Sequence, residues 1–111
     1  LPARFPKRIY ISFDADALDS ALMPSTGTPE PGGLSWQQAV DALSSVTRGR
    51  TVIGFDFVEL APVRGWHAPD FTAAKLVYTL MGMIVRNQRI LPCRPKSLLM
   101  EGSKIGKHRV S

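Results

Sequence analysis

The sequence predicts an α/β fold in which two parallel strands are joined by a crossover helix. One observation is the order of the elements: an apolar, β-rich stretch at residues 8–13, an amphipathic helical pattern after Ser35, and a second apolar stretch at residues 51–60. The other is the length of chain between the two apolar stretches, which exceeds the dozen or so residues that a parallel connection needs. Strand, helix and strand in this order form a right-handed β-α-β unit.

The composition is that of a globular protein small enough for one domain. Of its 111 residues, 44% are hydrophobic and 21% are charged, which argues against disorder over the whole chain. No apolar run approaches the roughly 20 residues that span a bilayer, so we expect no membrane partner. Cys93 is the single cysteine, which excludes an internal disulfide and a cysteine-based zinc cluster. We expect a cytoplasmic location.

The net charge of +5 comes from the end of the chain. Residues 1–85 carry seven Lys or Arg against eight Asp or Glu, whereas residues 86–111 carry seven against one. The basic segment lacks the interleaved aromatic side chains that stack on nucleic-acid bases. We therefore interpret residues 86–111 as a basic, loosely ordered tail and expect no nucleic-acid partner.

Two aspartates stand at the end of the first predicted strand, where residues 12–16 read SFDAD. Side chains two apart in a strand point the same way, which would aim the carboxylates of Asp14 and Asp16 together. One interpretation is that one carboxylate caps the following loop while the other is solvated. The other is a divalent cation held by both. The irregular loop that follows, up to Leu34, is long enough to suggest a functional role.

Ser35 and Gln38 have the spacing of a capping box, which predicts a helix from here to Val46 or Thr47. Its predicted apolar stripe consists of Trp36, Ala39, Val40 and Leu43. The strand at residues 51–60 is nearly all apolar, as a strand covered on both faces should be. Gly54 within it predicts the close approach of a neighbouring element.

Parallel strands bring their carboxyl ends to one edge of the sheet, where α/β proteins bind their ligands. Asp14, Asp16 and Glu59 should all lie at this edge. Asp56 has the opposite strand parity from Glu59, and we expect it to pair with a Lys or Arg rather than to take part in chemistry.

A final helix is predicted from Pro69, which suits a first helical turn, with Asp70 near the positive end of the helix dipole. We expect this helix to pack on the sheet. Its predicted apolar stripe is Phe71, Ala74, Val77, Tyr78, Met81 and Val85, widened by Leu76, Leu80 and Ile84.

Two stretches resemble a known family. Residues 12–33, SFDADALDSALMPSTGTPEPGG, resemble the third metal-binding signature of the ureohydrolases, the family of arginase and agmatinase, and residues 28–33 look most like the agmatinase branch. Residues 54–62, GFDFVELAP, resemble the segment that follows the next crossover helix in that family. The resemblance implies the C-terminal portion of a three-layer, mainly parallel-sheet arginase-like fold. Residues 1–85 would be this portion of the ureohydrolase domain.

The resemblance also implies roles for individual residues. Asp14 would bridge two manganese ions, and Asp16 would bind one of them. Glu59 would face the guanidinium group of the substrate, and Thr28 would hydrogen-bond to Glu59 and orient it. Asp19 would belong to the surroundings of the metal ligands or to the hydrogen bonding of the loop itself. In the family, metal-activated water attacks the guanidinium carbon, releasing urea and an amine.

The sequence departs from the family at several points. Ser20 stands where Pro is usual, and Ala15 where a larger aliphatic residue is usual. An upstream histidine, an Asp-x-His-x-Asp cluster and a catalytic histidine are absent from these 111 residues. The two histidines present do not replace them. His67 is a candidate pocket residue, although a lone histidine in a loop is more often a surface or capping group, and His108 lies in the basic tail.

The functional prediction is manganese-dependent hydrolysis of a guanidino C–N bond, with agmatine giving putrescine and urea. Formimidoylglutamate or another guanidino acid is the alternative substrate, and we expect a homo-oligomer. Because two carboxylates cannot hold a dinuclear cluster, the 111-residue chain should be inactive alone. A different class of function is a non-catalytic module that docks a partner through the basic tail. A metal-dependent transferase using Asp-x-Asp on a nucleotide phosphate is less favoured, since no glycine-rich phosphate loop accompanies it.

Overall fold

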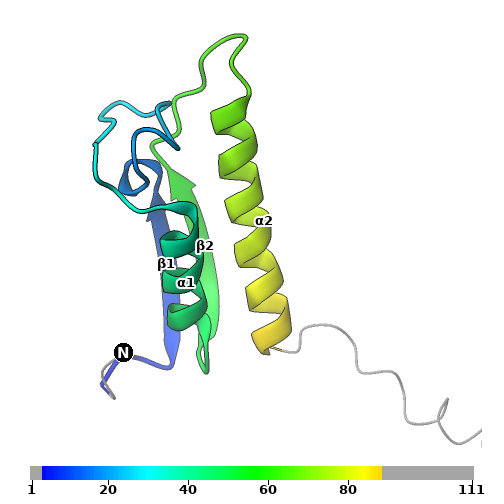
Figure 1. The fold of residues 1–111 in the computed structure, drawn as a ribbon. Coiled ribbons are helices and arrows are strands. Elements are labelled where there is room, and N and C mark those ends of the chain that lie inside the picture. Colours follow the sequence, from blue (N-terminus) through cyan, green and yellow to red (C-terminus); the bar gives the residue numbers. More distant parts are fainter. Residues whose placement is uncertain (1–3, 89–111) are drawn as a thin grey trace, which may run out of the picture.

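Two parallel strands and two α-helices form the described part of the computed structural model, residues 4–88 (Figure 1). The elements, in chain order, are β1 (Arg8–Asp14), the 3-10 helix η1 (Ala15–Ala17), α1 (Trp36–Thr47), β2 (Thr51–Val58) and α2 (Ala68–Gln88). Each predicted strand and helix is therefore present. No helix within residues 4–88 is both long enough and apolar enough to span a lipid bilayer.

The parallel pairing of β1 and β2 confirms the predicted crossover. Arg8 lies opposite Thr51 at one end, and Asp14 lies opposite Val58 at the other. The register shifts after Ile9, so that Tyr10 lies opposite Gly54 and Ile53 is an extra residue in β2. This bulge changes which side chains of β2 share a face.

One face of the sheet carries the core. Ile9 and Ile11 of β1 are buried with Val52 of β2, and the bulge returns Phe55 and Phe57 to the same face. The rings of the opposed pair Phe13 and Phe57 are stacked, with centroids 5.6 Å apart. Buried residues from both helices join this cluster, so α1 and α2 cover the same side of the two strands.

The opposite face of the sheet is open in the described part of the chain. Ile53 is 58% exposed and Val58 is 38% exposed, so the expected coverage of β2 on both faces is not found there. A side chain added at Gly54 would lie 2.8 Å from the Tyr10 ring. The close approach predicted at Gly54 is thus confirmed, and the neighbour is the tyrosine ring across the bulge.

Helix α1 begins and ends as predicted. The Ser35 hydroxyl accepts a hydrogen bond from the backbone N–H of Gln38, and the Gln38 side chain accepts one from the Ser35 N–H, which is a complete capping box. Ala39 and Leu43 are buried, with Trp36 and Val40 packed against the core. The predicted stripe is confirmed.

Helix α2 does not pack through the apolar stripe that was predicted to start at Phe71. Phe71 and Tyr78 are 72% and 73% exposed, and Met81 is 49% exposed. The residues predicted only to widen the stripe, with others beside them, form the buried face: Pro69, Ala73, Leu76, Leu80, Met83 and Ile84. The helix is apolar around much of its circumference, so its contacts with α1 and β2 select the buried face.

Helix α2 extends past the predicted domain boundary at residue 85. The helix continues to Gln88, three residues past that boundary. The rest of the predicted basic tail, residues 89–111, lies outside the described residues.

The long loop between β1 and α1 is closed at its base. Leu18 and Leu34 form a parallel bridge, with Asp19 N–H donating to Leu34 O at 2.9 Å and Leu34 N–H donating to Ala17 O at 2.8 Å. Leu18 and Met23 are fully buried, which anchors the loop to the core. A loop with joined ends and its own buried side chains is an Ω-loop. The prediction that this stretch lacks regular structure is wrong at its start, where η1 forms.

The close approach at the base of the loop makes Gly33 sensitive to substitution. In Gly33→Ala the new Cβ would lie 2.7 Å from both the backbone N of Asp19 and the carbonyl carbon of Leu18. Because these are main-chain atoms, the bridge must shift, and we expect the free energy of unfolding to fall by about 1–3 kcal/mol. Urea denaturation of the full chain, followed by circular dichroism, measures this.

Gly27→Ala, in the same loop, is the matched control because nothing lies within 4 Å of its added Cβ. Its effect should stay within about 0.5 kcal/mol. Equal losses from the two substitutions would contradict the packing argument.

Candidate metal and substrate site

The carboxyl ends of both strands meet at one edge of the sheet, as predicted. Asp14 is the last residue of β1 and lies opposite Val58, the last residue of β2, and Glu59 follows directly. Figure 1 shows the long loop and the β2–α2 connection at this same end of the strands. The edge therefore brings together residues that are far apart in the sequence.

Asp14 and Asp16 reach this edge by a route that strand parity did not predict. η1 starts immediately after Asp14, so Asp16 lies in a helical turn and not in an extended strand. The Asp14 side chain caps this turn, with Oδ1 accepting a hydrogen bond from the backbone N–H of Asp16 at 3.0 Å. The capping interpretation of one carboxylate is thus confirmed for Asp14, and the metal role of the pair stays a prediction.

Thr28 extends from the long loop to Asp16. Its hydroxyl Oγ1 donates to Asp16 Oδ2 at 2.7 Å. The resemblance implied Glu59 as the partner of Thr28, and the structure shows a different carboxylate. The orientation of Glu59 by Thr28 stays a prediction.

Glu59 has an unusual backbone conformation. Its φ of +63° is the only positive value at a non-glycine residue within residues 4–88. This left-handed conformation ends β2 at Val58, two residues before the predicted end of the strand. Strained residues of this kind concentrate at functional sites, and the side chain of Glu59 is exposed at the sheet edge.

The chain after Glu59 is tied to the long loop. Ala61 N–H donates to the carbonyl oxygen of Ser25 at 2.8 Å. Ser25 is itself only 2% exposed, so this hydrogen bond is anchored in the interior. The segment that carries Glu59 and the loop that carries Thr28 are thereby held against each other.

Asp19 organises the long loop. Its Oδ2 accepts from the Ala21 N–H at 2.9 Å, and its Oδ1 accepts from the Gly32 N–H at 2.8 Å across the loop. These hydrogen bonds, first that of Ala21 and then that of Gly32, hold the pKa of the Asp19 carboxyl below its ordinary value of 3.8. The expectation that Asp19 serves the hydrogen bonding of the loop is confirmed. The hydrogen bond from Ala21, two residues after Asp19, is one that the sequence of a turn can indicate. The hydrogen bond from Gly32 could not be predicted from the sequence, because it depends on how the loop folds.

Asp56 was predicted to pair with a Lys or Arg, and this is wrong. Its carboxylate instead accepts from the Tyr10 hydroxyl at 2.9 Å and from the Ser12 hydroxyl at 2.6 Å. The parallel register places Ser12 directly across from Asp56, with Tyr10 on the same face of β1. The hydrogen bond to Asp56 raises the pKa of Tyr10. Sequence alone could not identify these partners, because the pairing depends on the bulge.

His67 is exposed in the connection between β2 and α2. Its backbone carbonyl accepts from the Phe71 N–H at 2.9 Å, at the start of α2. Within the described chain no group of three or more His, Cys, Asp and Glu side chains is arranged to hold a metal ion. His108 lies outside the described residues.

The donor chemistry of Asp14 and Asp16 fits a divalent cation as two of its ligands. One oxygen of each, Asp14 Oδ1 and Asp16 Oδ2, is already hydrogen-bonded. The second oxygens have no hydrogen-bond partner among residues 4–88 and remain available. Ionised carboxylates are hard donors that suit Mg²⁺, Ca²⁺ and Mn²⁺. Two such residues supply part of a coordination shell, and the remaining ligands must come from elsewhere.

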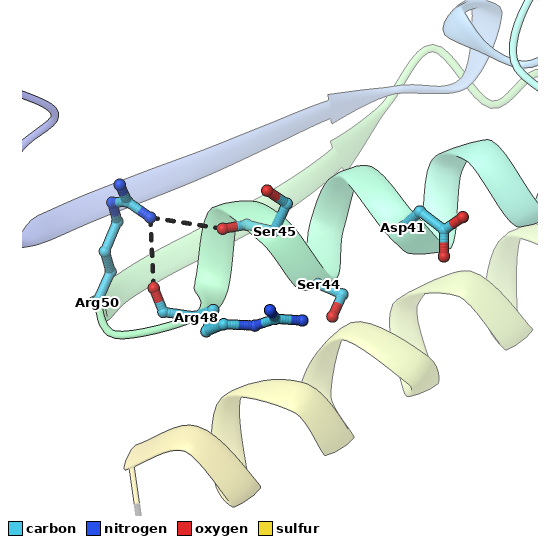
Figure 2. A pocket seen from close by; sticks show the side chains of 5 residues that line it. All are labelled: Asp41, Ser44, Ser45, Arg48 and Arg50. Atoms are coloured by element: carbon cyan, nitrogen blue, oxygen red, sulfur yellow. Dashed lines mark hydrogen bonds between the residues drawn. The ribbon is translucent and has the colours of Figure 1, made fainter. Parts of the chain in front are cut away.

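A separate hollow of about 520 Å³ lies at the far end of α1, lined by Asp41, Ser44, Ser45, Arg48 and Arg50 (Figure 2). Arg50 turns back over the last turn of the helix and donates to the carbonyls of Ser45, Val46 and Arg48 at 3.2–3.4 Å. Its guanidinium carbon also lies 5.0 Å from the centre of the Phe5 ring. Arg50 therefore serves as a cap for α1, at the sheet edge opposite to Asp14.

Residues 2–82 match the model of the arginase family, and the chain belongs to this family. The predicted arginase-like fold is confirmed by a solved relative, the agmatine ureohydrolase of Thermoplasma volcanium. It superposes with a TM-score of 0.65 at 31% identity, over 75% of this chain and 28% of that one.

Two curated relatives of the chain are named as a ureohydrolase and an agmatinase. The chain is 58% identical over 77 residues to the N(1)-aminopropylagmatine ureohydrolase of Thermus thermophilus, covering 69% of this chain and 26% of that protein. It is 41% identical over 86 residues to the agmatinase of Pyrococcus horikoshii, covering 78% of this chain and 30% of that protein. The chain thus spans between a quarter and a third of the length of these relatives.

The hydrogen bonds of Asp19 predict a pH-dependent contribution to stability. Because the folded protein lowers the pKa of Asp19, this contribution is present above the ordinary value of 3.8 and is lost as pH falls through the folded pKa. Asp19→Asn should therefore be less stable than the native chain at neutral pH. The difference should narrow on acidification to about pH 2.

Urea denaturation at a series of pH values measures this difference. Asp41→Asn, which removes one negative charge from the exposed side of α1, controls for net charge. A difference between native and Asp19→Asn that stays constant across the acidic range would contradict the role given to Asp19.

Proposed function

We propose that this chain supplies part of the active site of a manganese-dependent ureohydrolase, which cleaves a guanidino C–N bond and releases urea. The observation that carries the proposal is the arrangement at the sheet edge, where Asp14 ends β1, Asp16 lies in the helical turn that follows, and Glu59 comes directly after β2. Membership of the arginase family and the names of the relatives support it.

The two aspartates are the candidate metal ligands. Asp14 and Asp16 would hold manganese through the carboxylate oxygens that the loop leaves available. Bound manganese would supply an activated water at neutral pH, by lowering the pKa of that water. The hydrogen bonds from Asp16 N–H and from Thr28 restrict how each carboxylate can rotate. These two hydrogen bonds would therefore hold the candidate metal ligands in place before the reaction.

Glu59 is the candidate substrate ligand. A carboxylate can accept two parallel hydrogen bonds from the planar donors of a guanidinium group. The left-handed backbone at Glu59 turns the chain out of β2 and leaves this carboxylate exposed at the same edge as the aspartates. Glu59 would orient the guanidinium carbon toward the metal side of the site and stabilise its positive charge.

Agmatine or a substituted agmatine is the substrate that we propose. The support is the names of the relatives, an aminopropylagmatine ureohydrolase and an agmatinase, together with the agmatinase-like residues 28–33. The positively charged guanidinium is common to these molecules and matches Glu59. A guanidino acid differs from agmatine at the far end of the substrate, and formimidoylglutamate also has a formimidoyl group in place of the guanidinium. A panel of these compounds therefore distinguishes them.

A chimera tests the proposal directly. The segment of the Thermus thermophilus ureohydrolase that is 58% identical is replaced by the matching residues of this chain. We expect the chimera to release urea from agmatine or aminopropylagmatine in the presence of manganese. Glu59→Gln in the chimera should lower kcat/KM by about 100-fold, because a preorganised charge partner of the reacting group is lost.

Glu30→Gln makes the same chemical change on the exposed part of the long loop and is the matched control. Its kcat/KM should stay near that of the unmodified chimera. Similar losses from Glu30→Gln and Glu59→Gln, or full activity of Glu59→Gln, would count against the assignment of Glu59.

The 111-residue chain by itself should not release urea. Its described part holds two candidate metal ligands close together in sequence, and a two-metal reaction needs more. A colorimetric urea assay with purified chain, agmatine and manganese should give the background rate. Urea release above background that disappears in Asp16→Asn would show that this chain completes a site on its own.

A further inference from the structure

We propose that Thr28 is a positioning residue for Asp16: its hydroxyl holds one carboxylate oxygen so that the other is presented to a divalent cation. This inference rests on the proposed function, because it concerns the same candidate metal ligands. The resemblance gave Thr28 a different partner, so the assignment comes from the hydrogen bond found in this structure.

The hydrogen bond itself is short. Thr28 Oγ1 lies 2.7 Å from Asp16 Oδ2, the distance typical of a hydroxyl that donates to an ionised carboxylate. A hydroxyl has a single hydrogen and can donate only one such bond at a time. While Thr28 donates to Asp16 it cannot also donate to Glu59. Thr28 therefore cannot position Asp16 and orient Glu59 at the same time.

The position of Thr28 is set by the loop and not by Asp16. The Gly32 N–H donates to Asp19 Oδ1 at 2.8 Å, which joins the two sides of the loop. The Ser20 N–H also donates across the loop, to Glu30 O at 3.0 Å. Close packing of Gly33 against the Asp19 backbone completes the closure. Thr28 is the exposed residue that this pinned loop brings to η1.

The result is an ordered pair of carboxylates. Asp16 N–H holds Asp14 Oδ1, and Thr28 holds Asp16 Oδ2. Each aspartate thus has one oxygen engaged by the protein and one without a partner among the described residues. Partners that hold a ligand from behind in this way typically change metal affinity about 10-fold to 100-fold when they are removed.

Manganese binding to the full chain tests the inference. Mn²⁺ is added to isotope-labelled protein, and the broadening of the NMR signals of residues 14–16 gives the dissociation constant. Thr28→Val removes the donor and should raise this constant about tenfold. Thr28→Ser keeps the hydroxyl and should restore binding to within about twofold of the native value.

Thr79→Val is the matched control. Its hydroxyl also donates at 2.7 Å, to the Lys75 carbonyl within α2, far along the chain from the carboxylates. Manganese binding should be unchanged in this variant. A second readout needs no metal: the ¹³C shift of the Asp16 carboxyl should change in Thr28→Val and stay native in Thr28→Ser.

The outcomes separate the two claims. If the native chain binds Mn²⁺ at residues 14–16 and Thr28→Val binds it equally well, the positioning role is wrong and the proposed metal site stands. If native protein shows no Mn²⁺ effect at these residues, the two carboxylates do not hold the ion without the ligands that come from elsewhere. The ¹³C shift of the Asp16 carboxyl then decides the positioning role, which is wrong if this shift stays native in Thr28→Val. Weaker binding by Thr28→Val, rescued by Thr28→Ser, supports the role.

Discussion

The parallel pairing of β1 and β2 is the constraint on which every other feature of the site depends. It places Asp14 opposite Val58, so a carboxylate that ends one strand and a glutamate that follows the other occupy the same edge. The pairing is held from one side, where α1 and α2 bury a shared cluster against the strands. Because the connection through α1 is a crossover, both strand ends point the same way.

The long loop depends in turn on a few polar contacts at its base. The carboxylate of Asp19 binds two backbone N–H groups, and the bridge between Leu18 and Leu34 closes the loop. Ala61 then links the segment after β2 to the interior of the loop at Ser25. The metal half of the candidate site and its substrate half are therefore coupled through main-chain hydrogen bonds, and not only through the sheet.

The candidate site has two parts, which are held in place in different ways. Asp14, Asp16 and Thr28 form a connected set at the end of β1. Glu59 stands apart from them in the hydrogen-bond network, held instead by a strained backbone at the end of β2. This separation suits a site in which one group binds a cation and another binds the reacting group of the substrate.

Local signals in the sequence were enough to predict the strands and helices, and to predict that Asp14 and Glu59 share one edge of the sheet. The capping box at Ser35 determined where α1 starts, and the apolar strands determined where Asp14 and Glu59 would meet. Gly54 correctly indicated a close neighbour. These features depend on hydrogen bonds and side-chain periods within a few residues, so the sequence contains them.

Contacts between distant segments decided the rest. The bulge at Ile53 set which face of β2 is buried and gave Asp56 the hydroxyls of Tyr10 and Ser12 in place of a cation. Packing against α1 and β2 chose Leu76 and Leu80 over Phe71 and Tyr78 on a helix that is apolar around much of its circumference. The helical turn after Asp14 and the reach of Thr28 to Asp16 likewise required the folded loop. The sequence by itself determined which side chains are available at the edge, because strand order and direction follow from local pattern. Only the tertiary structure decided which of them touch, because hydrogen-bond partners across a sheet or loop depend on register and closure.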